Sequence, residues 1–227
     1  MIPISDELPT RRFPIVTVSI IVANVLVFAW QLFQGAQGEI AFYQYGLIPS
    51  VFWGKTEIIS VPFPPALTIF SSMFMHGNLY HLVFNMLYLW IFGNNVEDFL
   101  GRFQFILFYL GCGLAAGLTH AAIFPNSLIP TVGASGAIAG VMGGYLVLFP
   151  HARVVVLVFW LFFITFVRVP AALLLGFWIL LQIIYGLTSV VLPNQGGVAW
   201  FAHIGGFLLG AAWCRIVSQK IRPKVYW

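Results

Sequence analysis

The chain has 227 residues, of which 61% are hydrophobic and 7% are charged, whereas roughly 25% of the residues in an average soluble domain are charged. Its mean hydropathy is +0.98, which excludes an ordinary soluble fold and predicts a protein solvated mainly by lipid. Long unbroken apolar runs favour spanning helices over a β-barrel, whose strands would alternate with period two. The net charge of +4 does not indicate nucleic-acid binding, because the basic residues form no stripe.

Six apolar segments are long enough, or nearly so, to cross a bilayer as helices. In chain order they are about 15–33, 78–96, 103–124, 135–149, 171–190 and 198–217. The intervening segment 35–65 is broken by Gly and Pro but rich in aromatic residues, which is typical of a segment in the membrane interface. We therefore predict an all-α polytopic membrane protein, a six-transmembrane-helix bundle with an interfacial first outer loop, and a single membrane domain over residues 1–227.

A seventh apolar segment, Val154–Val167, is ambiguous. Its 14 residues would rise only about 21 Å as a helix, less than a hydrocarbon core of about 30 Å. A seventh span would also place Arg168 and the basic C-terminal tail outside, against the positive-inside rule. We therefore predict an interfacial or re-entrant connection, a short cytoplasmic N-terminus (1–14) and a basic cytoplasmic tail (218–227). A small multi-pass chain of this kind suits the plasma membrane of a prokaryote.

The fourth span is unusually short, since residues 135–149 rise about 22 Å as a helix and follow Pro130 and Gly133. Such a helix should begin below the outer membrane surface. Irregular backbone at that depth is tolerated only where protein surrounds it or where it lines a water-filled cavity. The sequence therefore predicts that Ser135 lies in such a cavity.

Few polar side chains lie within these spans, and no Asp, Glu, Lys or Arg is central in any of them. This argues against the ion and proton sites of a coupled transporter. The polar residues are Asn24, His76, Asn78, His81, Asn85, His120, Ser135, Gln182 and His203. Because His76 and His81 are five residues apart with no Glu between them, the His-Glu-x-x-His pattern of zinc peptidases is absent. We predict no metal and no cofactor.

Ser135 and His203 are the candidate nucleophile and base. A hydroxyl is a poor nucleophile until a base takes its proton, and neutral imidazole suits that task near pH 7. Small residues recur at spacings of three or four on both helices, which would permit close approach. They are Gly136, Gly140 and Gly144 on the fourth span, and Gly206 and Gly210 on the sixth. Ordinary membrane packing is the alternative explanation of these glycines. No Asp or Glu follows Asp98, so a dyad is expected rather than a triad.

His81 and Asn85 are four residues apart and therefore share one helix face. With the backbone amide of Ser135 at a helix N-terminus, they could stabilise a developing oxyanion. Alternatively, the two side chains simply form hydrogen bonds between helices. Spacing alone does not separate these possibilities.

Five motifs occur in order along the chain. They are Met-His-Gly-Asn (75–78), His-Leu-Val-Phe-Asn (81–85), Val-Glu-Asp-Phe-Leu-Gly (96–101), Gly-Ala-Ser-Gly (133–136) and Ala-His-Ile-Gly-Gly (202–206). Together they resemble the motifs of the rhomboid family of intramembrane serine proteases, of the bacterial or archaeal type, over roughly residues 66–215.

The resemblance implies a six-helix bundle with an outward-opening, water-filled cavity and substrates that are single transmembrane segments. It implies that Ser135 is the nucleophile and His203 the base and then the acid. His81 and Asn85 would be oxyanion partners, and His76 would brace the outer loop. The glycines expected to have structural roles near this site are Gly133, Gly136 and Gly206.

Two positions depart from the family pattern. Leu67 and Thr68 stand where many relatives have a Trp-Arg pair in the first outer loop. Ala139 stands one turn after Ser135, where some relatives have an aromatic ring that stacks on the histidine. Something else, such as water or backbone, must therefore orient His203.

The main hypothesis is a serine endopeptidase that cleaves transmembrane protein substrates within the lipid bilayer. A non-catalytic binder or retrotranslocation factor would resemble the inactive rhomboid relatives, which typically lose the serine or the histidine. A small-solute channel or transporter is a third possibility, but the spans carry no central charge and the two halves show no convincing repeat.

Overall fold

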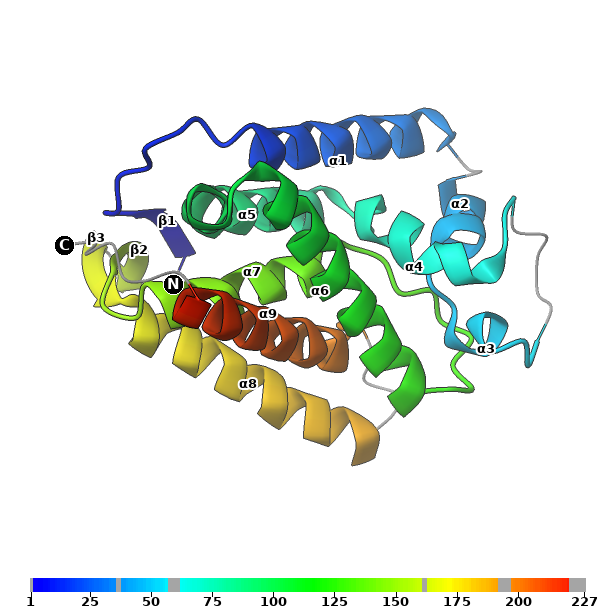
Figure 1. The fold of residues 1–227 in the computed structure, drawn as a ribbon. Coiled ribbons are helices and arrows are strands. Elements are labelled where there is room, and N and C mark those ends of the chain that lie inside the picture. Colours follow the sequence, from blue (N-terminus) through cyan, green and yellow to red (C-terminus); the bar gives the residue numbers. More distant parts are fainter. Residues whose placement is uncertain (1, 36–37, 57–61, 161–162, 192–196, 221–227) are drawn as a thin grey trace.

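The protein is a bundle of long helices, with a small sheet at one end and short helices at the other (Figure 1). This computed structural model describes residues 2–35, 38–56, 62–160, 163–191 and 197–220. The long helices are α1 (Ile15–Phe33), α5 (Leu79–Leu100), α6 (Arg102–Ile123), α7 (Ser135–Leu148), α8 (Ala171–Val191) and α9 (Trp200–Lys220). Each coincides with one of the six predicted segments to within about one turn at either end.

By length and composition, four of the described helices could cross a membrane: α1, α6, α8 and α9. The other two differ for separate reasons. α5 has 22 residues but is diluted by asparagines and two acids, and α7 has only 14 residues. The polytopic, mainly helical character is therefore confirmed, whereas the crossing of all six helices stays a prediction.

The segment between α1 and α5 forms short helices. They are α2 (Gly38–Tyr45), α3 (Pro49–Phe52), η2 (Pro65–Leu67), α4 (Thr68–Ser71) and η3 (Ser72–Phe74). Aromatic anchoring ties this segment to the bundle, because Trp53 donates its indole N–H to the Ala121 carbonyl at 2.9 Å. The structure contains no membrane, so the interfacial position of this segment also stays a prediction.

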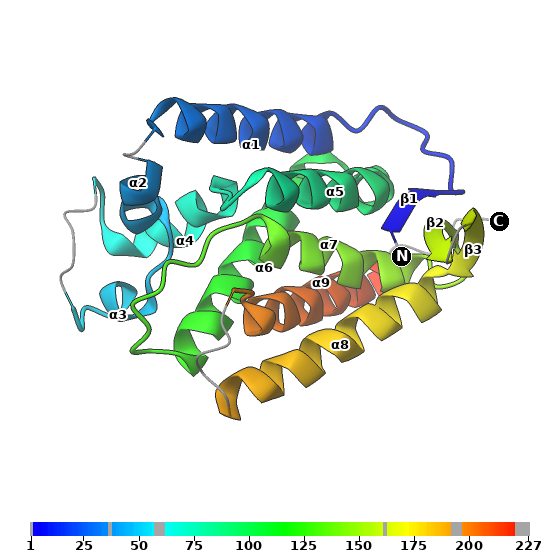
Figure 2. The same ribbon diagram turned by 180° about the vertical axis from the view of Figure 1, so that it is seen from behind.

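α7 lies in the middle of the bundle (Figures 1 and 2), and 10 of its 14 residues are buried. The irregular backbone just before it, residues 131–134, is bonded to neighbouring segments of the protein. Leu47 and Thr131 exchange two backbone hydrogen bonds of 3.0 and 2.8 Å, and the Gly133 N–H donates to the Ser72 carbonyl at 2.9 Å. These bonds satisfy polar backbone groups that lipid could not satisfy, which allows a short helix to begin inside the bundle.

The contact between α7 and α9 depends on glycine. A Cβ atom added to Gly206 would collide with the backbone carbonyl of Gly136, and one added to Gly210 would collide with that of Gly140. Because backbone atoms cannot rotate away as side chains can, these positions leave no room for any side chain. The predicted close approach of the two helices is confirmed.

The described residues of the 154–167 segment, 154–160 and 163–167, form strands rather than a helix. They lie in a hairpin of β2 (Arg153–Trp160) and β3 (Phe163–Pro170), which joins β1 (Ile2–Asp6) in an antiparallel sheet of order β1-β2-β3. β2 begins with a run of β-branched valines, which favours strands. Val154 and Val156 are fully buried, whereas Val155 between them is not, as the period of two in a strand requires. The expectation of an all-α chain is corrected accordingly, and residues 2–6 of the predicted N-terminal tail form a strand.

Three side chains at the end of α5 hold the N-terminal part of the chain. Glu97 accepts hydrogen bonds from the Thr17 N–H and hydroxyl, both at 2.7 Å, at the start of α1, where the helix dipole favours a carboxylate. Asp98 accepts from the Arg11 N–H at 3.0 Å. Asn95 donates to the Asp6 carboxylate at 2.7 Å.

Replacing Gly210 by Ala tests the α7–α9 contact. We expect Gly210→Ala to lower stability by about 1–3 kcal/mol, the usual cost of overpacking, because its Cβ meets backbone. Gly176→Ala on α8 is the matched control, since a Cβ there meets nothing within 4 Å and the better helix propensity of Ala should preserve stability. Thermal unfolding in detergent measures both, and equal melting temperatures would contradict the packing assignment.

Asp6 predicts a pH-dependent stability. Burial raises the pKa of this carboxyl from 3.8 to about 6, although a hydrogen bond from the Tyr145 hydroxyl at 2.6 Å partly opposes the shift. The folded protein therefore binds the proton more tightly than the unfolded chain, so this contribution to stability is present below pH 4 and is lost as the pH rises through 6. Asp6→Asn should remove it while keeping an oxygen acceptor for Tyr145. The melting temperature of the variant minus that of the wild type should increase between pH 4 and 6.5, and a constant difference would refute the assignment.

Candidate active site

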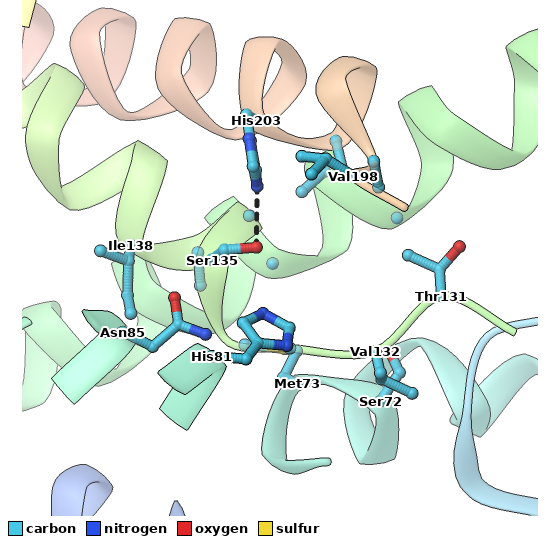
Figure 3. A pocket seen from close by; sticks show the side chains of 18 of the residues that line it. Ser72, Met73, His81, Asn85, Thr131, Val132, Ser135, Ile138, Val198 and His203 are labelled. Atoms are coloured by element: carbon cyan, nitrogen blue, oxygen red, sulfur yellow. Dashed lines mark hydrogen bonds between the residues drawn. The ribbon is translucent and has the colours of Figure 1, made fainter. Parts of the chain in front are cut away.

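A cavity of about 540 Å³ opens between α5, α7 and α9 (Figure 3). Its polar lining includes all four side chains predicted to take part in catalysis, namely Ser135, His203, His81 and Asn85. Much of the remaining lining is apolar. Ser135, the first residue of α7, lines this cavity, whereas the depth of the helix start below a membrane surface stays a prediction.

Ser135 and His203 are in direct contact across the α7–α9 seam. The Ser135 Oγ lies 2.8 Å from the His203 Nε2 (Figure 3), within the distance needed for proton transfer. Ser135 is the first residue of α7, and His203 lies in the first turn of α9 with 8% of its surface exposed. Two residues 68 positions apart in the chain thus form one hydrogen-bonded pair.

The other nitrogen of the imidazole also has a partner. The His203 Nδ1 lies 2.8 Å from the Oε1 of Gln182 on α8, and the Trp178 ring on the same helix lies 5.7 Å from the imidazole, measured between centroids. In the sequence, Gln182 stands out only as a polar residue within a span. The available signal was the four-residue spacing of Trp178 and Gln182, which places a ring and an amide on one helix face.

His81 and Asn85 lie on the side of Ser135 opposite His203 (Figure 3). Asn78 accepts a hydrogen bond from the His81 N–H at 2.8 Å and so caps the N-terminus of α5. The backbone at Gly133 passes close to both side chains. A Cβ on Gly133 would lie 2.7 Å from the His81 ring and 3.6 Å from the Asn85 Nδ2, and its φ of +123° is rarely adopted by other residues.

His76 is fully buried and links three parts of the chain. Its Nε2 lies 3.0 Å from the Asn85 Nδ2 and its Nδ1 lies 3.3 Å from the Phe74 carbonyl. Its backbone exchanges two hydrogen bonds, of 3.0 and 3.2 Å, with the Gln31 amide on α1. Asn85 therefore bonds a loop residue just before its own helix, so this contact is structural but is not the bond between helices that was one of the two alternatives. Its amide nitrogen carries a second hydrogen, so this bond leaves a donor for the cavity.

The glycines near the site act through close packing. Gly136 directly follows Ser135, and a Cβ on it would meet the Cβ of Ala116 at 2.5 Å. Gly206 packs its Cα face on the Gly136 carbonyl, one turn beyond His203. Within the described part of the chain, no group of three His, Cys, Asp or Glu side chains is placed to hold a metal ion.

Comparison with known proteins gives the family. A family model for the rhomboid domain matches residues 65–220, more than half of the chain. Rhomboid protein 1, mitochondrial, of Saccharomyces cerevisiae is 30% identical over 163 residues, which is 70% of this chain and 44% of that protein. RHOMBOID-like protein 6, mitochondrial, of Arabidopsis thaliana is 33% identical over 159 residues, which is 70% of this chain and 45% of that protein.

A bacterial relative matches a shorter region. Rhomboid protease GluP of Bacillus subtilis is 38% identical over 78 residues, which is 34% of this chain and 15% of that protein. The chain thus spans less than half the length of these relatives.

These relatives correct two expectations. The prediction of a prokaryotic plasma membrane is wrong, because the two relatives that align over 70% of this chain are mitochondrial proteins. For the same reason the narrower assignment to a bacterial or archaeal type is not supported. The prediction rested on the small size and multi-pass character of the chain, which, like charge bias, carry no information about which membrane the protein occupies.

The family model covers all five motifs, and four of them, at 75–78, 81–85, 133–136 and 202–206, contribute residues to the lining of one cavity. The chain belongs to the rhomboid family of membrane proteins.

Proposed function

We propose that the protein is a serine endopeptidase that cleaves transmembrane segments of other membrane proteins within the bilayer. The observation that carries this proposal is the 2.8 Å contact between the Ser135 hydroxyl and the His203 imidazole at the wall of a cavity. A nucleophile and a base in hydrogen-bond contact are the minimum equipment for acyl transfer. A non-catalytic binder has no need of this pair.

The first half of the proposed reaction forms an acyl-enzyme. The Ser135 Oγ attacks the carbonyl carbon of the scissile peptide bond while its proton passes to the His203 Nε2. The tetrahedral intermediate then collapses, the C–N bond breaks, and His203 returns the proton to the leaving amine. In the second half, water attacks the ester carbonyl carbon and gives a proton to the His203 Nε2. The bond between that carbon and the Ser135 Oγ then breaks, His203 returns the proton to the Oγ, and the new carboxyl end is released.

The oxyanion of each tetrahedral intermediate needs fixed donors. We assign this role to the backbone N–H of Ser135 and to the side chains of His81 and Asn85. The first N–H groups of a helix have no partner within the helix, and both side chains line the same cavity as Ser135. Gly133 supports this assignment, because its lack of a side chain lets the backbone pass next to the side chains of His81 and Asn85.

The need to unwind the substrate helix determines which segments can be cleaved. A helical segment hides its peptide bonds in its own hydrogen bonds, so it must unwind before Ser135 can reach a carbonyl. Segments that contain Gly or Pro unwind most readily. We therefore propose single transmembrane segments with such residues as substrates, and a mitochondrial membrane as the compartment to test.

Removing either member of the pair should abolish cleavage. We expect Ser135→Ala and His203→Ala each to lower kcat for a fluorogenic transmembrane substrate in liposomes by at least about 10³-fold, without loss of the folded state. Ser19→Ala is the control, because Ser19 is an exposed serine of α1 that bonds only within its own helix. Cleavage by Ser135→Ala at the wild-type rate would refute the proposed function.

Chemical labelling separates the protease from an inactive binder. A fluorophosphonate should attach to the wild type, and mass spectrometry should locate the adduct at Ser135. His203→Ala should label slowly, because Ser135 would lack its base. Failure to label the folded wild type at Ser135 would favour the binder.

Asn85 tests the oxyanion assignment. We expect Asn85→Ala to lower kcat by about 10²–10³-fold, the usual effect of losing one such donor, with little change in KM. Because Asn85 also bonds His76, the melting temperature is measured in parallel. A lowered melting temperature with unchanged kcat would contradict the oxyanion role and show that Asn85 acts only through its bond to His76.

A further inference from the structure

Gln182 contacts the site from a helix that carries neither member of the Ser135–His203 pair. Its side chain is 6% exposed, and its Oε1 lies 2.8 Å from the His203 Nδ1. Its Nε2 donates to the Trp178 carbonyl one turn earlier on α8, at 3.4 Å. Both ends of the amide are therefore occupied inside the bundle.

The two bonds together fix the orientation of the amide. A backbone carbonyl only accepts hydrogen bonds, so the Gln182 nitrogen must face Trp178. The Gln182 oxygen must then face His203. Rotating the amide by half a turn would bring two oxygens together and place the amide N–H against the imidazole.

This orientation determines which imidazole nitrogen carries the proton. Because the Gln182 oxygen only accepts, the His203 Nδ1 must donate, and the neutral ring then has its lone pair on Nε2. The Nε2 faces the Ser135 hydroxyl at 2.8 Å. The hydroxyl can therefore donate to Nε2, which is the direction that proton abstraction requires.

Aromatic rings complete the surroundings of the imidazole. Trp178 lies at 35° to the His203 ring with centroids 5.7 Å apart, and Trp200 meets the ring edge-on at 6.4 Å. Ala139, at the position where some relatives have an aromatic ring, is buried. Trp178, one turn before Gln182 on α8, places a ring beside the histidine instead.

We propose that Gln182 is the positioning residue of the pair, a neutral counterpart of the carboxylate in a serine-protease triad. This inference rests on the proposed function. Gln182 holds His203 in the Nδ1–H tautomer and stabilises the imidazolium that forms when Ser135 gives up its proton. An uncharged amide suits this place, since an unpaired carboxylate within a membrane bundle is costly. The orientation of the dyad thus depends on the packing of α8 against α9.

Two substitutions test this role by kinetics. Gln182→Met keeps the length and removes the acceptor, and we expect kcat to fall about 100-fold while KM changes less than about threefold, as expected when a group acts only on the chemical step. Gln182→Glu restores an oxygen acceptor, and its kcat should be at least about tenfold higher than that of Gln182→Met. Gln104→Met, at an exposed position of α6, controls for the substitution itself. Wild-type kcat in folded Gln182→Met would overturn the proposal.

A spectroscopic measurement tests the proposal without any variant at Gln182. In the wild type labelled with ¹⁵N-histidine, the His203 signals should show the Nδ1–H tautomer, with assignment by their absence from His203→Ala. A predominant Nε2–H tautomer would overturn the role of Gln182. If the wild type neither cleaves nor labels at Ser135, the proposed function fails instead, and the tautomer still shows whether Gln182 orients the ring.

Discussion

Close approach of two backbones is the constraint on which the site depends. The Ser135 hydroxyl reaches the His203 imidazole because α7 and α9 touch through glycines, with Gly206 against the Gly136 carbonyl and Gly210 against the Gly140 carbonyl. Any side chain at these positions would separate the helices by more than a hydrogen bond can tolerate. The packing of the bundle and the chemistry of the site therefore share the same residues.

A second constraint keeps α7 short and central. The irregular chain before Ser135 is held by backbone bonds to the Leu47 and Ser72 segments, so the polar backbone groups of Thr131 and Gly133 have partners within the protein. At the opposite end, Tyr145 of α7 bonds Asp6 of β1, and Glu97 of α5 caps α1. The serine thus begins a helix that is fixed at both ends, which limits its movement relative to His203.

The helix positions could be predicted because long apolar runs leave few alternatives in lipid. The hairpin was missed because Val154–Val167 was considered only as a helix too short to span, although its valine run also suits a strand that buries Val154 and Val156. The composition of this segment shows that it is apolar but does not show whether its backbone is helical or extended. The compartment was also predicted wrongly, because the size and multi-pass character of a chain do not identify its membrane.

The sequence by itself determined the lipid-solvated helical class, the short helix that begins at Ser135 and the likeness of its motifs to one family, because apolar length and residue type are local properties. Only the tertiary structure decided which groups surround the imidazole. The Gln182 and Trp178 contacts to His203 depend on how α8 packs against α9, and the bond between Asn85 and His76 depends on the path of the chain before α5. Such contacts join residues whose relative positions are set by helix packing, and spacing shows which residues share a face of one helix but not which other helix that face meets.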